Sequence, residues 1–527
     1  MAKYTTNYVN LIADNLRDRY KSGFPILKEL VQNADDAGAG SLVFGHHAGF
    51  AAGVDHPLLQ GPALWVLNDG GFKPKDKQAI KSFGLNGKAA DDGAIGKFGL
   101  GMKSVFHLCE SFFYVAFDGQ DEHCEILSPW FGDENTSETH QRWEQISEAD
   151  RTRLLAVARH QDEARNGNTW FMLWVPLRRH DHLAELDGKK LPGIIDRFPG
   201  DRDAEDLDFL AVADVDQRLG LLLPLLRHLH TARFAGAAGG RAFRVQLLLS
   251  DDGARRLDHE NDGLQCAGIA ADQRPRPEHL RFLVSQRVAI LSEPFESLRS
   301  NDSWPKSIAI LESGKWGSVP DKTRPEGAVM FAHADKRVGR LVLQWAVFLP
   351  TEELRLTYVA QMPNTSREHR VVLHGQFFVD AGRRGIADYE LLHAPREDLP
   401  RHASQQLVLQ HWNQALAQEV VLPEFLPALD AYARTNGLRD EELAALTGAI
   451  ARCAPEGESA STGFFNSFGA HICRQLAWVR SLSTDGPAWT LVRLDSARML
   501  PLPNPSMRDH ARPWRALPGL AKFSGVV

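Results

Sequence analysis

Three short segments near the start of the chain constrain its fold more than any other feature, because they require a helix, a strand end and a glycine-rich loop to follow in that order. They read E-L-V-Q-N-A-D-D-A from Glu29 to Ala37, N-D-G-G from Asn68 to Gly71, and G-A-I-G-K-F-G-L-G-M-K-S from Gly93 to Ser104. Each is weak alone, so the argument depends on their order and spacing.

The first segment lies on a predicted helix. Pro25 suits its first turn, where a missing N–H costs little, and Gly38 suits its end. At about 100° per residue, Glu29, Asn33 and Asp36 fall on one narrow stripe. The apolar residues fill the adjoining arc: Ile26, Leu27, Leu30, Val31 and Ala34. A carboxylate there can orient a water and an amide oxygen can ligate Mg²⁺, although an amphipathic helix with a solvated polar edge gives the same pattern.

The second segment ends a predicted buried strand, the apolar run Ala63 to Leu67. A partly buried Asp69 can accept a hydrogen bond from the exocyclic amine of a base, and the glycines allow a flat ring to approach the backbone. A plain Asp-Gly turn fits the same residues.

The third segment is a glycine-rich loop that leads into a helix predicted to start near Met102. Backbone N–H groups in this setting bind anions, most often phosphate. The segment lacks the G-x-x-x-x-G-K-[ST] layout of a P-loop, and it does not follow the strand-loop-helix pattern of a dinucleotide-binding fold.

Taken together, the three segments resemble the N, G1 and G2 boxes of the GHKL ATPases. The wording E-L-V-Q-N-A-D-D-A with I-G-K-F-G-L-G-M-K-S-V-F-H-L is most similar to the sacsin branch of the heat-shock chaperone ATPases. Thr169, which opens a predicted strand to Val175, is similar to the characteristic threonine of that fold's last sheet strand. The resemblance implies an α+β protein with an N-terminal GHKL (Bergerat) two-layer α/β sandwich and a mixed sheet.

The resemblance also implies roles for individual residues. Glu29 would be the general base, Asn33 would hold Mg²⁺, and Asp69 would bind the adenine amine, with Gly71 and Thr169 completing the pocket. Residues 72–95 would form a lid over ATP. The other residues assigned to the nucleotide are Asp36, Lys88, Gly96, Lys97, Phe98, Gly99, Leu100 and Gly101. For Lys97, a solvent-exposed lysine is an equal alternative.

A weaker resemblance to the same branch continues in the second half of the chain. The segment Leu373 to Arg384 has a G-x-F strand that runs into a turn with two arginines, and Trp412 to Leu416 is also similar. Arg383 or Arg384 would reach the γ-phosphate and stabilise charge in the transition state. Paired arginines on a surface turn are the simpler alternative.

A cluster of glycine and alanine at 235–240 suggests the first domain boundary. We expect a sacsin-type ATP-binding domain over 1–240, a strand-rich α/β middle domain, similar to a transducer domain, over 241–400, and a mainly helical region over 401–527. In the middle domain, Phe243–Leu249, Ala328–Ala332 and Leu341–Leu349 are among the predicted strands.

Charge and cysteine content narrow the classes of protein to which this chain can belong. The net charge of −7 and the pI of about 6.3 lack the overall basic character of a nucleic-acid-binding protein. The five cysteines are far apart, which suggests neither a zinc site nor a disulfide framework. Without an apolar signal core in residues 1–20 or an 18-residue apolar run, we expect a cytoplasmic protein with no membrane span.

The resemblance implies a Mg²⁺-dependent ATPase in which lid closure, and ATP-dependent homodimerisation, act on a protein client or partner subunit. A nucleic-acid client, in a DNA-associated or antiviral system, stays open. The alternative is a nucleotide-gated binding scaffold with little turnover. A histidine kinase is disfavoured because the Glu29 helix begins almost at the start of the chain, and a type II topoisomerase because no cleavage domain is recognisable.

Overall fold

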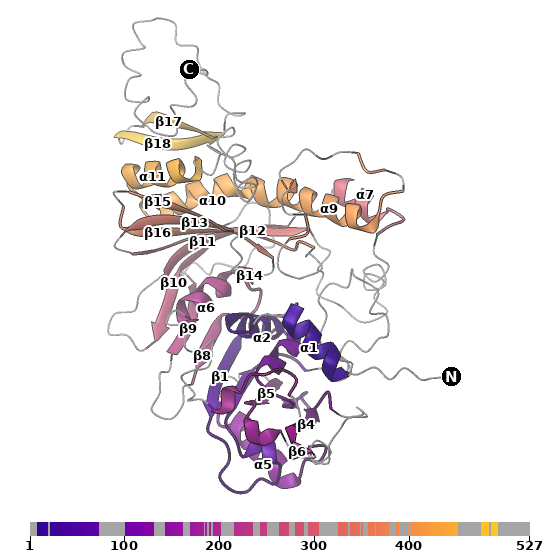
Figure 1. Ribbon diagram of the computed structural model, residues 1–527. Coiled ribbons are helices and arrows are strands. Elements are labelled where there is room, and N and C mark those ends of the chain that lie inside the picture. Colours follow the sequence, from indigo (N-terminus) through magenta and orange to yellow (C-terminus); the bar gives the residue numbers. More distant parts are fainter. Residues whose placement is uncertain are drawn as a thin grey trace, which may run out of the picture. The chain divides into compact units, whose positions relative to one another are not determined.

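The computed structural model divides the chain into two compact units (Figure 1), 1–248 with 269–279, and 249–268 with 280–527. The residues that the structure describes are 8–18, 22–72, 101–130, 143–161, 169–183, 185–186, 189–190, 193–201, 215–235, 243–249, 263–272, 280–288, 293–304, 325–335, 338–347, 349–350, 357–363, 365–378, 386–388, 391–392, 396, 398–400, 402–451, 476–483 and 486–493.

A mixed sheet forms the centre of the first unit. Among the described residues it has seven strands, in the order β9-β8-β1-β2-β5-β3-β4. The β1–β8 pair is parallel and the other pairs are antiparallel. The strands are β1 (Ser41–His47), β2 (Ala63–Asn68), β3 (Phe112–Phe117), β4 (Glu122–Leu127), β5 (Trp170–Pro176), β8 (Thr231–Phe234) and β9 (Phe243–Leu249).

Helices cover this sheet from both sides. Phe106 contacts Phe112 of β3 with ring centroids 5.5 Å apart, while His56 contacts Phe113 on the same strand at 4.8 Å. Consecutive strand residues face opposite ways, so these contacts lie on opposite faces of the sheet. The helices are α1 (Tyr8–Asp18), α2 (Phe24–Asp36), α5 (Glu148–Arg159) and α6 (Val215–Leu222), with short helices η1 (Pro57–Leu59), η2 (Gly101–His107), η4 (His180–His182), η5 (Pro199–Asp201) and η7 (Leu223–Leu225).

The second unit has its own sheet, with four central strands in the order β11-β12-β16-β13. β12 pairs antiparallel with β11 and β16, β13 pairs parallel with β16, and β15 and β14 also pair with β13. The strands are β11 (Leu280–Val288), β12 (Glu326–Asp335), β13 (Gly339–Val347), β14 (Leu349–Pro350), β15 (Thr357–Met362) and β16 (Arg367–Gly375). β6 (Glu185–Leu186) and β7 (Lys189–Lys190) form a small hairpin in the first unit, and β10 (Gly263–Asp272) has residues in both units.

Helices lie along the second sheet (Figure 1), and aromatic side chains make contacts between them. Phe331 of β12 contacts Phe425 and Tyr432 of one helix, with ring centroids 5.4 and 5.2 Å apart. The helices are α7 (Glu293–Arg299), α9 (Gln405–Ala415), the π-helix η10 (Leu416–Val421), α10 (Leu422–Thr435) and α11 (Asp440–Ala451). A hairpin follows, formed by β17 (Leu476–Ser483) and β18 (Gly486–Arg493); we did not expect this hairpin in a region predicted to be mainly helical.

Several elements confirm the sequence predictions. α2 has Pro25 in its first turn, and Gly38 follows its end with a φ of 76°. The strands at 63–67 and 243–249 are present. The helix predicted near Met102 is a 3₁₀-helix that starts at Gly101. In the part of the chain that the structure describes, no helix is long and apolar enough to cross a membrane.

Candidate functional site

The polar stripe of α2 lies at the edge of its buried face, as predicted. The helix buries Phe24, Ile26, Leu27, Leu30, Val31, Ala34 and Asp35. Glu29, Asn33 and Asp36 are half-buried. No described residue forms a hydrogen bond or ion pair with the side chain of Glu29 or Asn33.

The turn after β2 is fixed to the end of α2. Asp69 Oδ1 accepts hydrogen bonds from the backbone N–H of Gly40 at 2.8 Å and of Ser41 at 2.9 Å. The backbone N–H of Gly71 donates to the carbonyl of Ala37 at 3.0 Å. These bonds place Asp69 and Gly71 beside the C-terminal end of the helix that carries Glu29 and Asn33.

The two glycines of this turn differ in the space around them. A Cβ atom on Gly70 would lie 2.8 Å from Ala37 Cβ and 2.9 Å from Asn68 Oδ1, so only glycine fits. Among the described residues, a Cβ atom on Gly71 would meet only the Ala37 carbonyl oxygen, 3.9 Å away. The described part of the chain therefore leaves space at Gly71, next to Asp69, where the sequence predicts a pocket for a flat ring.

Thr169 lies at the same edge of the sheet. In the antiparallel β2–β5 pair, Asn68 is opposite Phe171. Continuing this register places Thr169 opposite Gly70, in the turn that holds Asp69. The strand pairing thus brings together two predicted nucleotide contacts that are about a hundred residues apart in sequence.

Several predicted site residues lie outside the described residues. They are Lys88, Gly96, Lys97, Phe98, Gly99, Leu100, Arg383 and Arg384. Gly101 is described and is the first residue of η2.

The segment after β16 has a described anchor on each side of the two arginines. The buried side chain of Asn413 accepts a hydrogen bond from the N–H of Phe378 at 2.8 Å, and it donates to the carbonyls of Phe378 and Ala387 at 2.9 and 3.2 Å. Asn413 thus joins the two ends of the stretch that contains Arg383 and Arg384. This role explains why the segment Trp412 to Leu416 of α9 has an amide side chain at position 413.

Sequence reasoning missed the role of Asp35. Its carboxylate is 7% exposed and accepts hydrogen bonds from the backbone N–H groups of Arg227, His228 and Leu229, at 3.1, 2.7 and 2.9 Å. Asp35 thus joins α2 to the segment that enters β8. The partners lie more than 190 residues away, so no local pattern points to them.

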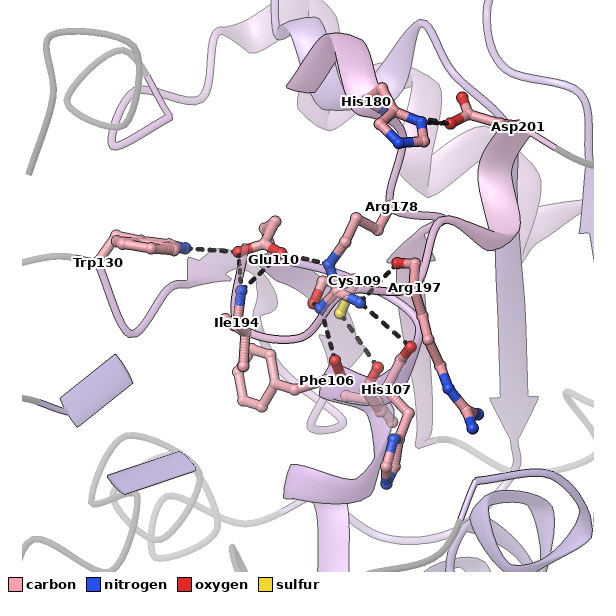
Figure 2. A network of polar contacts seen from close by, with 11 residues as sticks. Phe106, His107, Cys109, Glu110, Trp130, Arg178, His180, Ile194, Arg197 and Asp201 are labelled. Carbon is pink, nitrogen blue, oxygen red and sulfur yellow. Dashed lines mark hydrogen bonds and ion pairs between the residues drawn. The ribbon is translucent and has the colours of Figure 1, made fainter. Parts of the chain in front are cut away.

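A buried ion pair was also missed. Glu110 and Arg178 are in direct contact and both side chains are 0% exposed (Figure 2). Burial raises the pKa of Glu110, and the Arg178 guanidinium opposes this rise. The one available signal was Glu110 itself, an acid between the apolar runs of η2 and β3.

Comparison with known proteins supports the resemblance that the sequence motifs indicate. The family model of the Sacsin domain matches residues 5–184. Human sacsin is 38% identical over 111 residues, which are 20% of this chain and 2% of that much longer protein. The matched region includes α2, the Asp69 turn and Thr169, and it confirms the resemblance to the sacsin branch. Residues 5–184 of this chain are thus similar to the Sacsin domain.

Proposed function

We propose that the N-terminal domain, residues 1–240, is a GHKL-type sandwich that binds ATP with Mg²⁺ and hydrolyses it. One observation carries the proposal. Asp69 is hydrogen-bonded to Gly40 and Ser41, and Gly71 to Ala37, all in the short stretch that leads from α2 into β1. On α2 itself, the side chains of Glu29 and Asn33 have no hydrogen-bonding partner among the described residues. Half-buried polar groups of this kind are available for the few polar contacts that orient a ligand in a binding site.

Asp69 would bind the base through one oxygen and the protein through the other. Oδ1 already accepts two backbone N–H groups. Oδ2 has no donor among the described residues, so it can accept a hydrogen bond from the exocyclic amine of adenine. The open space at Gly71 would admit the ring, and the hydroxyl of Thr169 would add a second polar contact at the same edge.

Glu29 would orient and deprotonate the attacking water, one helical turn from Asn33. Asn33 would ligate Mg²⁺ as a single protein ligand, which suits an ion that keeps waters and phosphate oxygens in its coordination sphere. When bound, Mg²⁺ neutralises phosphate charge. The amides of the glycine-rich segment 96–101 would hold the phosphates, with Lys97 and Lys88 beside them, and Arg383 or Arg384 would stabilise the transition state.

The hydrolysis cycle would close residues 72–95 as a lid and drive a conformational change in the middle domain, residues 241–400, and in residues 401–527. ATP-dependent homodimerisation and a protein client or partner subunit in the cytoplasm fit this cycle. Two alternatives remain for the tests to decide: a nucleic acid as the client, and a nucleotide-gated scaffold with little turnover.

Phosphate release separates the enzyme from the scaffold. Glu29→Ala should abolish ATP turnover while ATP binding persists. The control is Gln32→Ala, on the same helix but away from the stripe, which should turn over ATP like the wild type. Equal phosphate release by wild type and Glu29→Ala would end the hydrolase proposal. ATP binding without turnover in the wild type would favour the scaffold.

A further inference from the structure

Arg178 uses all five N–H groups of its guanidinium, although it is completely buried (Figure 2). Nε donates to Glu110 Oε1. Each of the two Nη atoms donates to two main-chain carbonyls, at distances from 2.6 to 3.3 Å. These carbonyls belong to Phe106, His107, Cys109 and Arg197.

The first effect of this arrangement is on the end of η2. The last carbonyls of a helix have no partner within the helix. The backbone N–H of Arg178 also donates to the carbonyl of Leu108, at 2.6 Å. Arg178 therefore binds four consecutive carbonyls, from Phe106 to Cys109. A positive charge is also favourable at this end of a helix.

The second effect is on Glu110, which fixes the guanidinium in turn. Its carboxylate accepts hydrogen bonds from Trp130 Nε1 at 2.9 Å and from the N–H of Ile194 at 3.1 Å. The two buried charges thus compensate each other, and every donor has an acceptor. A lysine cannot reproduce this arrangement, because its ammonium is a point charge with three donors and no planar fork.

The segment that Arg178 holds is in contact with the proposed site. η2 packs against α1 and α2, and α2 carries Glu29 and Asn33. η2 also begins at Gly101, the last glycine of the glycine-rich segment. Fixing the end of η2 therefore fixes both the support of α2 and the position of Gly101, where η2 begins.

We infer that Arg178, held by Glu110, is a positioning residue of the nucleotide site: it fixes η2 against α2 and so sets the placement of Gly101 relative to the Glu29–Asn33 pair. This inference rests on the proposed ATPase function. It goes beyond a stabilising ion pair, because it predicts an effect on nucleotide chemistry in protein that is fully folded.

The test compares wild type with Arg178→Lys at a temperature well below the unfolding transition of both. Near-UV circular dichroism checks the fold, hydrogen exchange follows the amides of residues 101–109, and steady-state kinetics gives kcat/KM for ATP. We expect faster exchange in 101–109 and a loss of kcat/KM of at least about tenfold, because small misplacements of catalytic groups have large effects on rate. The control is Arg179→Lys, which changes the half-exposed neighbour paired with Asp181 and should leave both readouts unchanged.

Unchanged exchange and unchanged kcat/KM in folded Arg178→Lys would overturn the inference, even if the melting temperature fell. If wild type bound and hydrolysed no ATP, the proposed function would fail, and the exchange result alone would decide whether Arg178 holds η2. If Arg178→Lys did not fold, Trp130→Phe would replace it. This change removes one donor to Glu110, and it should shift exchange and kcat/KM in the same direction by less; no shift in either would overturn the inference.

Discussion

Asp69 Oδ1 accepts a hydrogen bond from the backbone N–H of Ser41 at 2.9 Å, so the acid that ends β2 is fixed to the first residue of β1. The same oxygen accepts the N–H of Gly40. One carboxylate oxygen thus belongs to the fold, and the other faces away from these bonds. The two roles of Asp69, anchoring the turn and reading a base, can be separated by mutation.

Asp69→Asn should separate them. The amide oxygen of asparagine can keep both backbone hydrogen bonds, but its NH₂ group would oppose the exocyclic amine of adenine. We expect thermal unfolding close to that of wild type and a loss of ATP affinity of at least about tenfold, since a base donor would be left unpaired. Asp69→Ala should lose both stability and affinity. Wild-type ATP affinity in Asp69→Asn, measured by calorimetry, would contradict the assigned role.

Gly70 and Gly71 form a matched pair of tests. Gly70→Ala places a methyl group 2.8 Å from Ala37 Cβ, and we expect a loss of about 1–3 kcal/mol in the free energy of unfolding in urea. Gly71→Ala meets no atom closer than 3.9 Å, so stability should change by less than about 0.5 kcal/mol. Its added methyl should instead weaken ATP binding. Equal effects of the two changes on stability would contradict the claim that a Cβ atom has room at Gly71 and none at Gly70.

Asp35→Asn should destabilise the first unit without a direct effect on nucleotide contacts. The change replaces a buried carboxylate with a neutral amide. The carboxylate accepts hydrogen bonds from three backbone N–H groups just before β8. We expect a loss of about 2 kcal/mol in urea unfolding, the usual range for hydrogen bonds to a charged group. The control is Asp14→Asn, where the acid is 59% exposed and the change should be small. A similar small loss for both would show that Asp35 is not the anchor we describe.

His182 should make stability depend on pH. Burial lowers its pKa from 6.5 to about 4, and its side chain is only 8% exposed. The unfolded chain therefore binds a proton more readily than the folded one, so the stabilisation is complete above pH 6.5 and is lost as the pH falls towards 4. The loss should be about 3 kcal/mol. His182→Gln should flatten the profile of unfolding free energy in this range, while His228→Gln, at an exposed position, should not.

Elements with local patterns could be predicted from the sequence, and the links between them could not. The helical stripe of Glu29 and Asn33 follows from 3.6-residue periodicity, and the strand before Asp69 from an apolar run that ends in glycines. The sequence did not predict that η2 is a 3₁₀-helix. The carbonyls at its end are bound by Arg178, which lies 69 to 72 residues further along the chain.

The candidate site shows the same division. From the spacing of the motifs along the chain, the sequence predicted that α2, the Asp69 turn and Thr169 belong to one site. It could not predict that Asp69 is bonded to Gly40 and Ser41, since the pairing of β1 with β2 sets that contact. It gave no role to Asp35, because the partners of this residue come from a segment that reaches α2 through tertiary folding.

The most direct test is a structure of the full chain with a non-hydrolysable ATP analogue and Mg²⁺. We expect the adenine amine within hydrogen-bonding distance of Asp69 Oδ2, Asn33 Oδ1 in the coordination sphere of Mg²⁺, and the Glu29 carboxylate facing the γ-phosphate. A nucleotide bound elsewhere, or Glu29 and Asn33 directed away from a cavity shared with Asp69, would contradict the assignment of this domain as an ATPase.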